Sequence, residues 1–177
     1  RQIILQGKIN CLFRNFIVLP HGPVSNRPGT KYVAEVKTPA KATRVLPFQR
    51  SFSDTLVIEF GENYFRFHTL GAPILTWAVT AWSGATAYIV GDLASRLWVN
   101  YYCKTAHTNQ QPPNATYWYP LTSDLLEVPH TYTELQLSDV EIVQSGDVLT
   151  LVHPSHPVRE LRRLSAVNWE LIDVVFE

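Results

Sequence analysis

The chain has 177 residues, of which 46% are hydrophobic and 17% are charged, and 15 Lys and Arg balance 15 Asp and Glu. This composition excludes an intrinsically disordered chain, because such chains have few apolar and many charged residues. It also excludes a protein that holds nucleic acid through a global basic field. No apolar run approaches the ~18 residues of a membrane-spanning helix. The length predicts one sizeable domain, or one domain with a small insert.

Two further features of composition concern origin and redox state. The chain begins at Arg1 and has no Met, from which we expect a piece of a longer protein. Its two cysteines, Cys11 and Cys103, are too few and too far apart in sequence for a disulfide framework. We expect reduced, half-buried thiols, as in a protein made in the cytosol.

The first part of the chain predicts turns and short strands. Pro and Gly clusters at 20–23 and 27–29 favour chain reversals. The alternating pattern of 32–37 predicts a strand, and 43–47 predicts a second one. Further along, 55–60 and 64–68 alternate on either side of a three-residue loop that contains Gly61, which predicts a β-hairpin.

Residues 77–121 differ in composition from the rest. They contain four of the five Trp and five of the eight Tyr, but no Phe and only three charged residues. A patch of different composition inside a continuous chain is typical of an inserted module. We therefore predict two parts, an inserted unit at 77–121 and a β body formed by 1–76 together with 122–177.

The C-terminal part predicts a meander of strands at 148–152, 158–164 and 168–176, joined by a turn at 153–157. Helix is scarce, with one or two turns expected at 123–127 and at 131–137. The predicted fold class is mainly β, built from antiparallel hairpins and meanders, with a small three-stranded inserted module.

No enzymatic motif is present, since the chain lacks G-x-S-x-G, H-E-x-x-H, P-loop and G-x-G-x-x-G patterns. We predict no enzyme activity, no cofactor and no metal site. Cys103 precedes His107 by four residues, but a small core Cys beside an exposed His is the favoured interpretation. His153 and His156 are interpreted as turn residues, because zinc needs more ligands than this pair supplies. Asp54 and Glu59 are interpreted as solvated hairpin positions.

The arginines are the remaining charged feature. Arg159, Arg162 and Arg163 form a local cluster, and Arg44, Arg50 and Arg66 are expected on strands. Phosphate neutralisation in a DNA channel would use such side chains, yet the neutral net charge favours a solvated face or ion pairs between subunits.

Several segments, taken in order, resemble the tail nozzle (tail tubular) proteins of bacteriophages and prophages. Before the insert these are 15–22 (NFIVLPHG), 26–30 (NRPGT), 44–48 (RVLPF), 56–61 (LVIEFG) and 64–67 (YFRF). After it they are 143–149 (VQSGDVL), 151–154 (LVHP), 161–164 (LRRL) and Trp169.

The resemblance implies a virion structural protein of the tail, made in the cytoplasm of a bacterial host. Its expected partners are other copies in a ring, together with other tail proteins and portal or adaptor proteins. It also implies contact with DNA in the exit channel without specific nucleic-acid binding, and no membrane span. The last 30 residues would form one blade of a partial β-propeller-like region. The alternative function is a carbohydrate-binding adhesion module on a β scaffold.

The inserted unit is similar to the small carbohydrate-binding modules of the family 5/12 type. The matching positions are Trp82, Ala85, Tyr88, Gly91-Asp92, Tyr101-Tyr102, Pro113 and Trp118. We assign Trp82, Tyr88 and Trp118 to the core of the unit.

The candidate glycan-binding residues are Trp98, Tyr101, Tyr119 and His107. Trp98 is expected in an exposed turn between two strands, because a bulky side chain at a tip buries little of itself. Ala106-His107 stands where related modules present adjacent exposed tryptophans. This departure leads us to expect weak or no binding to crystalline chitin and cellulose, and at most modest affinity for a host surface glycan.

Overall fold

The computed structural model describes residues 16–18, 24–26, 29–76 and 79–175. The chain divides into two compact units, residues 1–32 and 33–177. In the first unit, β1 (Phe16–Val18) and β2 (Val24–Asn26) form an antiparallel hairpin. Three sequence-based expectations lie partly or wholly outside the described residues. They concern Cys11, the turn at 20–23 and part of the turn at 27–29.

The second unit contains two larger antiparallel sheets. The first has the order β12-β5-β4-β3, and β6 pairs with the free end of β5. Its strands are β3 (Arg44–Gln49), β4 (Thr55–Gly61), β5 (Tyr64–Thr69), β6 (Ala72–Pro73) and β12 (Glu127–Pro129). The predicted hairpin is confirmed as β4 and β5, with Asn63 at a positive φ of 65° in its tight turn.

The second sheet is a meander of four consecutive strands, β13-β14-β15-β16. These strands are β13 (Glu141–Ser145), β14 (Val148–His153), β15 (His156–Arg163) and β16 (Trp169–Asp173). The three predicted strands are confirmed, although β16 ends earlier than predicted. The turn predicted at 153–157 is shorter, because His153 ends β14 and His156 begins β15, so these two residues pair as strand ends. The fourth, β13, was not predicted, because only its Ile142 and Gln144 are even partly covered and its alternation is weak.

Two local predictions were wrong, and a third was confirmed in part. Residues 32–37 form no strand with another described segment, and the N–H of Lys37 donates to the Glu59 carboxylate. Segment 131–137 contains one turn of helix, as expected, in the form of the 3-10 turn η1 (Glu134–Gln136). Segment 123–127 contains no helix: residues 123 and 124 lie in a bend, Leu125 pairs with Leu75 as an isolated bridge, and Glu127 begins β12.

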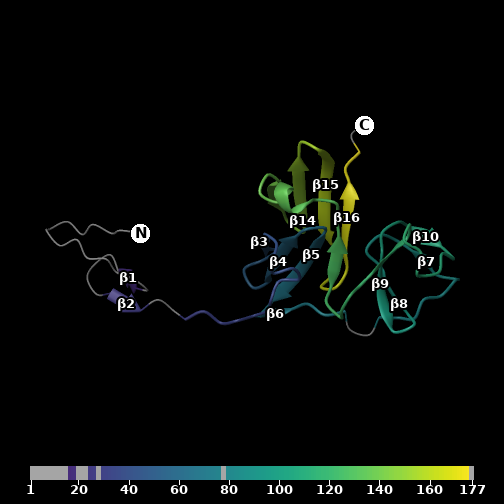
Figure 1. Ribbon diagram of the computed structural model, residues 1–177, viewed down its shortest axis with the longest axis horizontal. Helices are drawn as coiled ribbons and strands as arrows, with labels where there is room; N and C mark the ends of the chain where they lie inside the picture. The colour runs from purple at the N-terminus through teal and green to yellow at the C-terminus, as the bar shows by residue number, and fades with distance from the viewer. Residues whose placement is uncertain (1–15, 19–23, 27–28, 77–78, 176–177) are drawn as a thin grey trace. The chain divides into compact units, whose positions relative to one another are not determined.

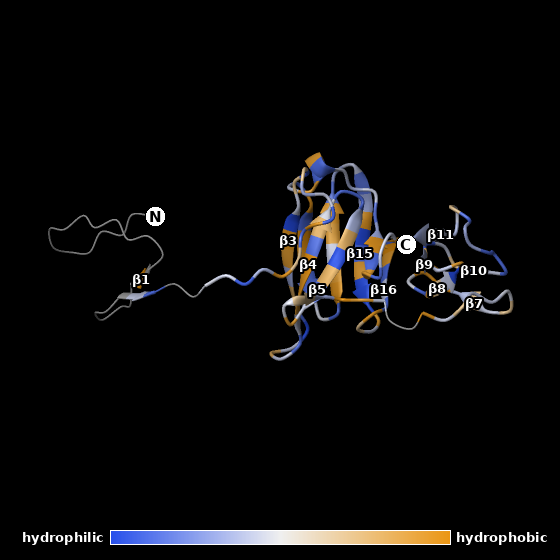
Figure 2. Ribbon diagram, turned by 60° about the horizontal axis from the view of Figure 1, so that its bottom comes forward, coloured by the Kyte–Doolittle hydropathy of each residue, from blue (hydrophilic) through white to orange (hydrophobic). Residues whose placement is uncertain are grey.

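The core lies between the two larger sheets. More and less buried residues alternate along β3 and β14, so each sheet turns one apolar face inward. Figure 2 shows apolar and polar residues next to each other on β3, β4 and β5. Trp169 of β16 is fully buried, and its ring stacks on Phe67 at 4.2 Å and meets Phe48 edge-on at 5.1 Å. Side chains from both sheets therefore form one hydrophobic core.

Residues 79–121 form two smaller sheets beside the larger ones (Figure 1). One has the order β11-β9-β8 and the other pairs β10 with β7. Their strands are β7 (Ala87–Tyr88), β8 (Leu93–Arg96), β9 (Val99–Cys103), β10 (His107–Thr108) and β11 (Trp118–Pro120). The described fold is thus mainly β and antiparallel, as predicted, with three strands in the main sheet of this region.

The chain leaves and re-enters the larger sheets at adjacent positions. The Thr76 N–H donates to the Asp124 carbonyl at 2.7 Å, and the Leu126 N–H donates to the Ile74 carbonyl at 2.9 Å. A second attachment lies at β16, where the Tyr102 hydroxyl donates to the Trp169 carbonyl at 3.0 Å. Among the described residues, no helix is long and apolar enough to cross a membrane.

Candidate functional site

The small sheets have an aromatic core of their own, centred on Trp118 and Tyr88. The rings of these two residues lie 5.0 Å apart, and Trp82 packs against them half-buried, as predicted. The expectation that Tyr101 is exposed was wrong, since it is only 6% exposed and faces Trp118. β9 is the central strand, so Tyr101 is covered on one face while Tyr102 enters the main core on the other.

His107 also belongs to this core. Its ring lies 4.9 Å from that of Trp118, 5.1 Å from Tyr117 and 5.4 Å from Tyr88. Both ring nitrogens are buried and have no hydrogen-bond partner among the described residues. Desolvation lowers the pKa of His107, so the ring is held neutral and apolar in character. Its contacts are those of a packing residue.

Tyr119 takes part in a buried polar network. Its hydroxyl donates to Glu127 Oε1 at 2.7 Å and accepts from Lys37 Nζ at 3.3 Å. Desolvation, and then the hydrogen bond to Glu127, raises the pKa of the Tyr119 phenol. The Tyr119 hydroxyl is therefore committed to Glu127, and the side chain is half-buried.

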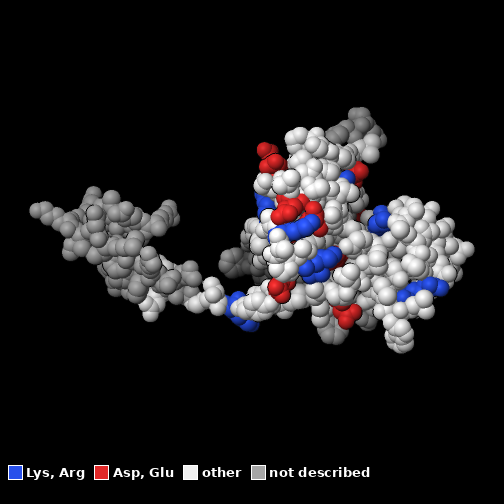
Figure 3. Space-filling view, in the orientation of Figure 1, with Lys and Arg blue, Asp and Glu red and all other residues white. Residues whose placement is uncertain are grey.

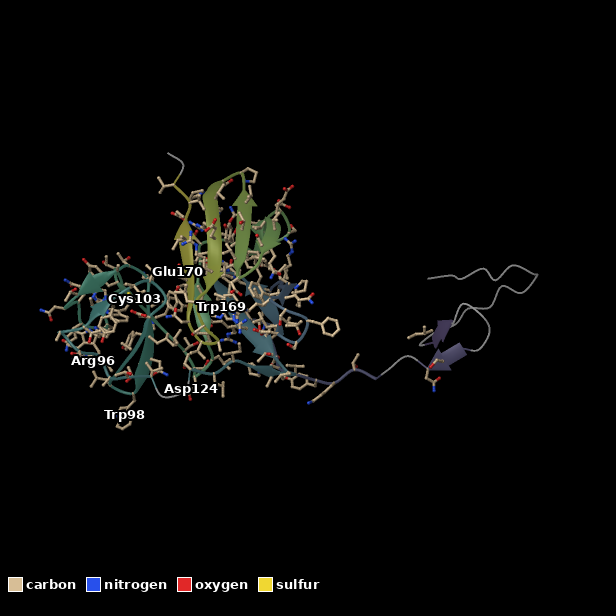
Figure 4. The ribbon with its side chains drawn as sticks, turned by 180° about the vertical axis from the view of Figure 1, so that it is seen from behind. Arg96, Trp98, Cys103, Asp124, Trp169 and Glu170 are labelled. Carbon is tan, nitrogen blue, oxygen red and sulfur yellow. The ribbon has the colours of Figure 1, made fainter. Side chains whose placement is uncertain are left out.

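Trp98 is the predicted residue that the structure exposes. It lies with Leu97 in the two-residue turn between β8 and β9, and its side chain projects away from the ribbon (Figure 4). Both turn residues have positive φ, 51° for Leu97 and 66° for Trp98. Such turns favour Asn-Gly, and a left-handed conformation costs other residues roughly 1–2 kcal/mol each. The sequence thus keeps a costly, fully exposed indole at this tip, as is typical of functional positions.

A cleft of about 860 Å³ lies beside this turn. Residues 80–82 form one wall by bonding along the edge of β8, with the Trp82 N–H donating to the Ser95 carbonyl at 2.9 Å. The polar side chains that line it are Thr76, Ser95, Arg96, Asn100, Gln111 and Asp124. The apolar ones are Leu75, Val79, Ala81, Trp82, Leu97 and Trp98.

The chemistry of this lining is that of binding. Among the described residues that line it, the ionisable side chains are Arg96 and Asp124. An apolar cleft with a few convergent polar groups is typical of a small-ligand site. Two indoles add flat apolar faces, and the Trp82 Nε1–H is buried without a partner among the described residues. Of this cleft, the sequence indicated only Trp98. Gln111 and Asp124 are far from Trp98 in the chain, so no sequence pattern places them beside it.

The other candidate pairs do not form reactive sites. Cys103 Sγ donates to the Thr105 carbonyl, and burial raises the pKa of this thiol to about 11. His153 and His156 face each other across a tight turn with ring centroids 5.2 Å apart. Within the described ranges, no group of three or more His, Cys, Asp or Glu side chains could hold a metal ion.

Glu59 was wrongly interpreted as a solvated hairpin residue. It is 4% exposed and accepts hydrogen bonds from Tyr64 at 2.5 Å and from His68 at 3.1 Å. Desolvation raises the pKa of Glu59, but these bonds and the Lys37 N–H outweigh it and hold that pKa below its ordinary value. The register of the hairpin places Glu59 opposite Arg66. This pairing of opposite charges could have indicated a buried charge network from the sequence.

The arginine cluster is neutralised within the chain. Arg159 pairs with Asp173 at 2.8 Å, Arg163 with Asp54 at 2.7 Å, and Arg162 with Glu160 at 2.6 Å. Side chains of both signs lie next to each other over the larger sheets, whereas the surface of the small sheets is mostly uncharged (Figure 3). These arginines therefore do not form a basic track on the described surface.

Comparison with known proteins identifies no relative, since no protein-family model and no curated protein matches this chain.

Proposed function

We propose that the chain is a non-enzymatic structural subunit of a bacteriophage or prophage tail, and that the cleft beside Trp98 binds a surface glycan. The observation that carries the proposal is the exposed indole at a strained turn, adjoining a cleft lined by a second indole and polar side chains. Sugar rings offer C–H faces to aromatic rings and hydroxyls to polar groups, so this lining suits them.

The glycan part is tested with the whole 177-residue protein on a glycan array. We expect binding to at least one glycan, and Trp98→Ala should weaken it by about fivefold or more, the equivalent of one lost aromatic contact. Phe52→Ala is the matched control, because Phe52 is equally exposed but lies on the β3–β4 loop outside the cleft. The proposal would be contradicted if the protein bound no glycan on the array, or if Trp98→Ala bound glycan as tightly as the native protein.

The tail-subunit part is supported by the ordered sequence resemblance and by an apolar groove on the outer face of β3 and β4. This groove of about 480 Å³ includes Val45, Pro47 and Val57. Val45 is 64% exposed and Val57 is 41% exposed. Contiguous apolar surface of this kind is typical of association sites, and we assign it to a second copy of the chain in a closed ring.

Light scattering over a range of concentrations tests this assembly. We expect the mass to rise above that of one chain, and Val45→Asp together with Val57→Asp should return it to a single chain without unfolding the protein. A single-chain mass at every concentration would overturn the assembly part. If that protein still bound a glycan, it would favour the second candidate function, an adhesion module that needs only the Trp98 cleft.

A further inference from the structure

One arginine differs from all others in the described part of the chain. Five arginines there form ion pairs with carboxylates, and these are Arg50, Arg66, Arg159, Arg162 and Arg163. Arg44 instead donates to the carbonyls of Leu137 and Val140. Arg96 has neither kind of partner among the described residues, and it lines the cleft beside Trp98.

Arg96 is nevertheless held in place. It is the last residue of β8, directly before the turn that carries Trp98, and it is only partly exposed. With the Gln111 amide oriented so that its oxygen faces the guanidinium, Arg96 Nε and Nη2 donate to that oxygen at 3.1 and 3.3 Å. A neutral amide positions the guanidinium but leaves its charge unneutralised, and the remaining N–H groups are available to a ligand.

Among the described residues that line the cleft, Asp124 carries a carboxylate, but it forms no ion pair with Arg96. Asn100 is occupied by its hydrogen bond to Thr76, at 3.2 Å. Arg96 thus places a positive charge without a paired carboxylate next to the exposed indole, in a partly enclosed space where charge interactions are stronger than in open water.

We propose that the ligand of this cleft is an acidic glycan, whose carboxylate binds Arg96 while an adjoining sugar ring stacks on Trp98. This inference rests on the glycan-binding function proposed above and adds the charge of the ligand. The planar guanidinium donates parallel N–H bonds that match a carboxylate, and charge-assisted bonds are about twice as strong as neutral ones. A sugar hydroxyl could not neutralise the charge in this way.

The test compares acidic oligosaccharides with their neutral methyl esters. The probes are oligogalacturonate and sialyllactose, each paired with its own methyl ester, so that the sugar faces remain and only the charge is removed. We expect the 177-residue protein to bind at least one acid about tenfold or more tightly than its ester. The preference should shrink as salt is added.

Variants assign the preference to one side chain. Arg96→Gln should bind acid and ester equally, and Arg96→Lys, which keeps the charge without the planar fork, should retain a smaller preference. Arg162→Gln removes the same charge from β15, outside the cleft, and should leave the preference unchanged. Thermal unfolding of each variant checks that it is folded.

The outcomes separate the two proposals. Equal binding of acid and ester by the native protein, or a preference that survives in Arg96→Gln, would overturn the acidic-glycan inference. If Trp98→Ala then still abolished binding, the glycan function would stand without it. Binding of neither member of either pair would reject the acidic ligand, and the glycan array then decides the broader function separately.

Discussion

Folding strongly alters the ionisation of His130. It lies against the rings of Phe65 at 4.5 Å and Phe60 at 5.0 Å, and its Nδ1 accepts from the Tyr132 N–H at 3.0 Å. Desolvation lowers the pKa of His130 from 6.5 to about 3, with smaller contributions from nearby positive groups including Arg159. The folded protein therefore keeps this ring neutral.

This shift predicts acid sensitivity with a defined sign. Between pH 6.5 and about 3 the unfolded chain binds a proton at His130 that the folded chain does not, so stability falls as pH falls. From pH 7 to pH 5 the loss from this group is about 2 kcal/mol. Urea unfolding at both pH values should show a smaller loss for His130→Asn, which keeps an acceptor for Tyr132 but cannot titrate.

The same experiment has an internal reference. His107 and His156 also have pKa values lowered by desolvation, and they remain in both proteins, so some pH dependence should persist in the variant. Equal losses of stability in native protein and variant would show that His130 is not the source.

At the scale of elements, the β8–β9 turn carries an exposed indole in a backbone conformation that lowers the stability of the folded protein. Replacing Leu97-Trp98 by Asn-Gly (Leu97→Asn with Trp98→Gly) should stabilise the protein by about 1–2 kcal/mol, because both new residues accept positive φ. The variant should also lose glycan binding. Thermal unfolding and the glycan array measure the two effects, and a destabilised variant that still binds would contradict this account of the turn.

The contact of the small sheets with β16 depends on Gly91. A Cβ at this position would lie 2.8 Å from the Trp169 carbonyl oxygen, and its φ is +96°. Gly91→Ala should therefore cost more than Gly146→Ala, which has a φ of +57° but open space around it. Strain alone costs about 1 kcal/mol, and denaturant unfolding should show a larger loss for Gly91→Ala. Equal losses of unfolding free energy in the two variants would mean that the close approach of Gly91 to Trp169 does not contribute to the cost of the substitution.

Sequence patterns predicted the elements that local signals determine. The hairpin of β4 and β5 follows from alternation around a Gly-containing loop, and the exposed Trp98 follows from its place between two strands. Tyr101 was misplaced because one sequence cannot show that β9 is covered on both faces. The burial of Glu59 and the positions of Gln111 and Asp124 depend on contacts between distant segments, which periodicity does not report.

At the scale of the whole molecule, residues 33–177 share one main core to which the small sheets contribute. Tyr102 and Leu121 belong to that core together with Trp169. The cleft adjoins the crossing at Thr76 and Asp124, where the chain enters and leaves the small sheets. The cleft is thereby next to the backbone hydrogen bonds that join the small sheets to the larger ones.

The most direct test of the glycan cleft is a two-dimensional NMR spectrum of the tryptophan indole N–H groups during titration with a glycan that the array identifies. Trp98 and Trp82 line the cleft, whereas Trp118 and Trp169 are buried in the two cores. We predict that the Trp98 and Trp82 signals shift with glycan concentration while those of Trp118 and Trp169 stay in place. Saturable binding that leaves the Trp98 signal unmoved would contradict the account.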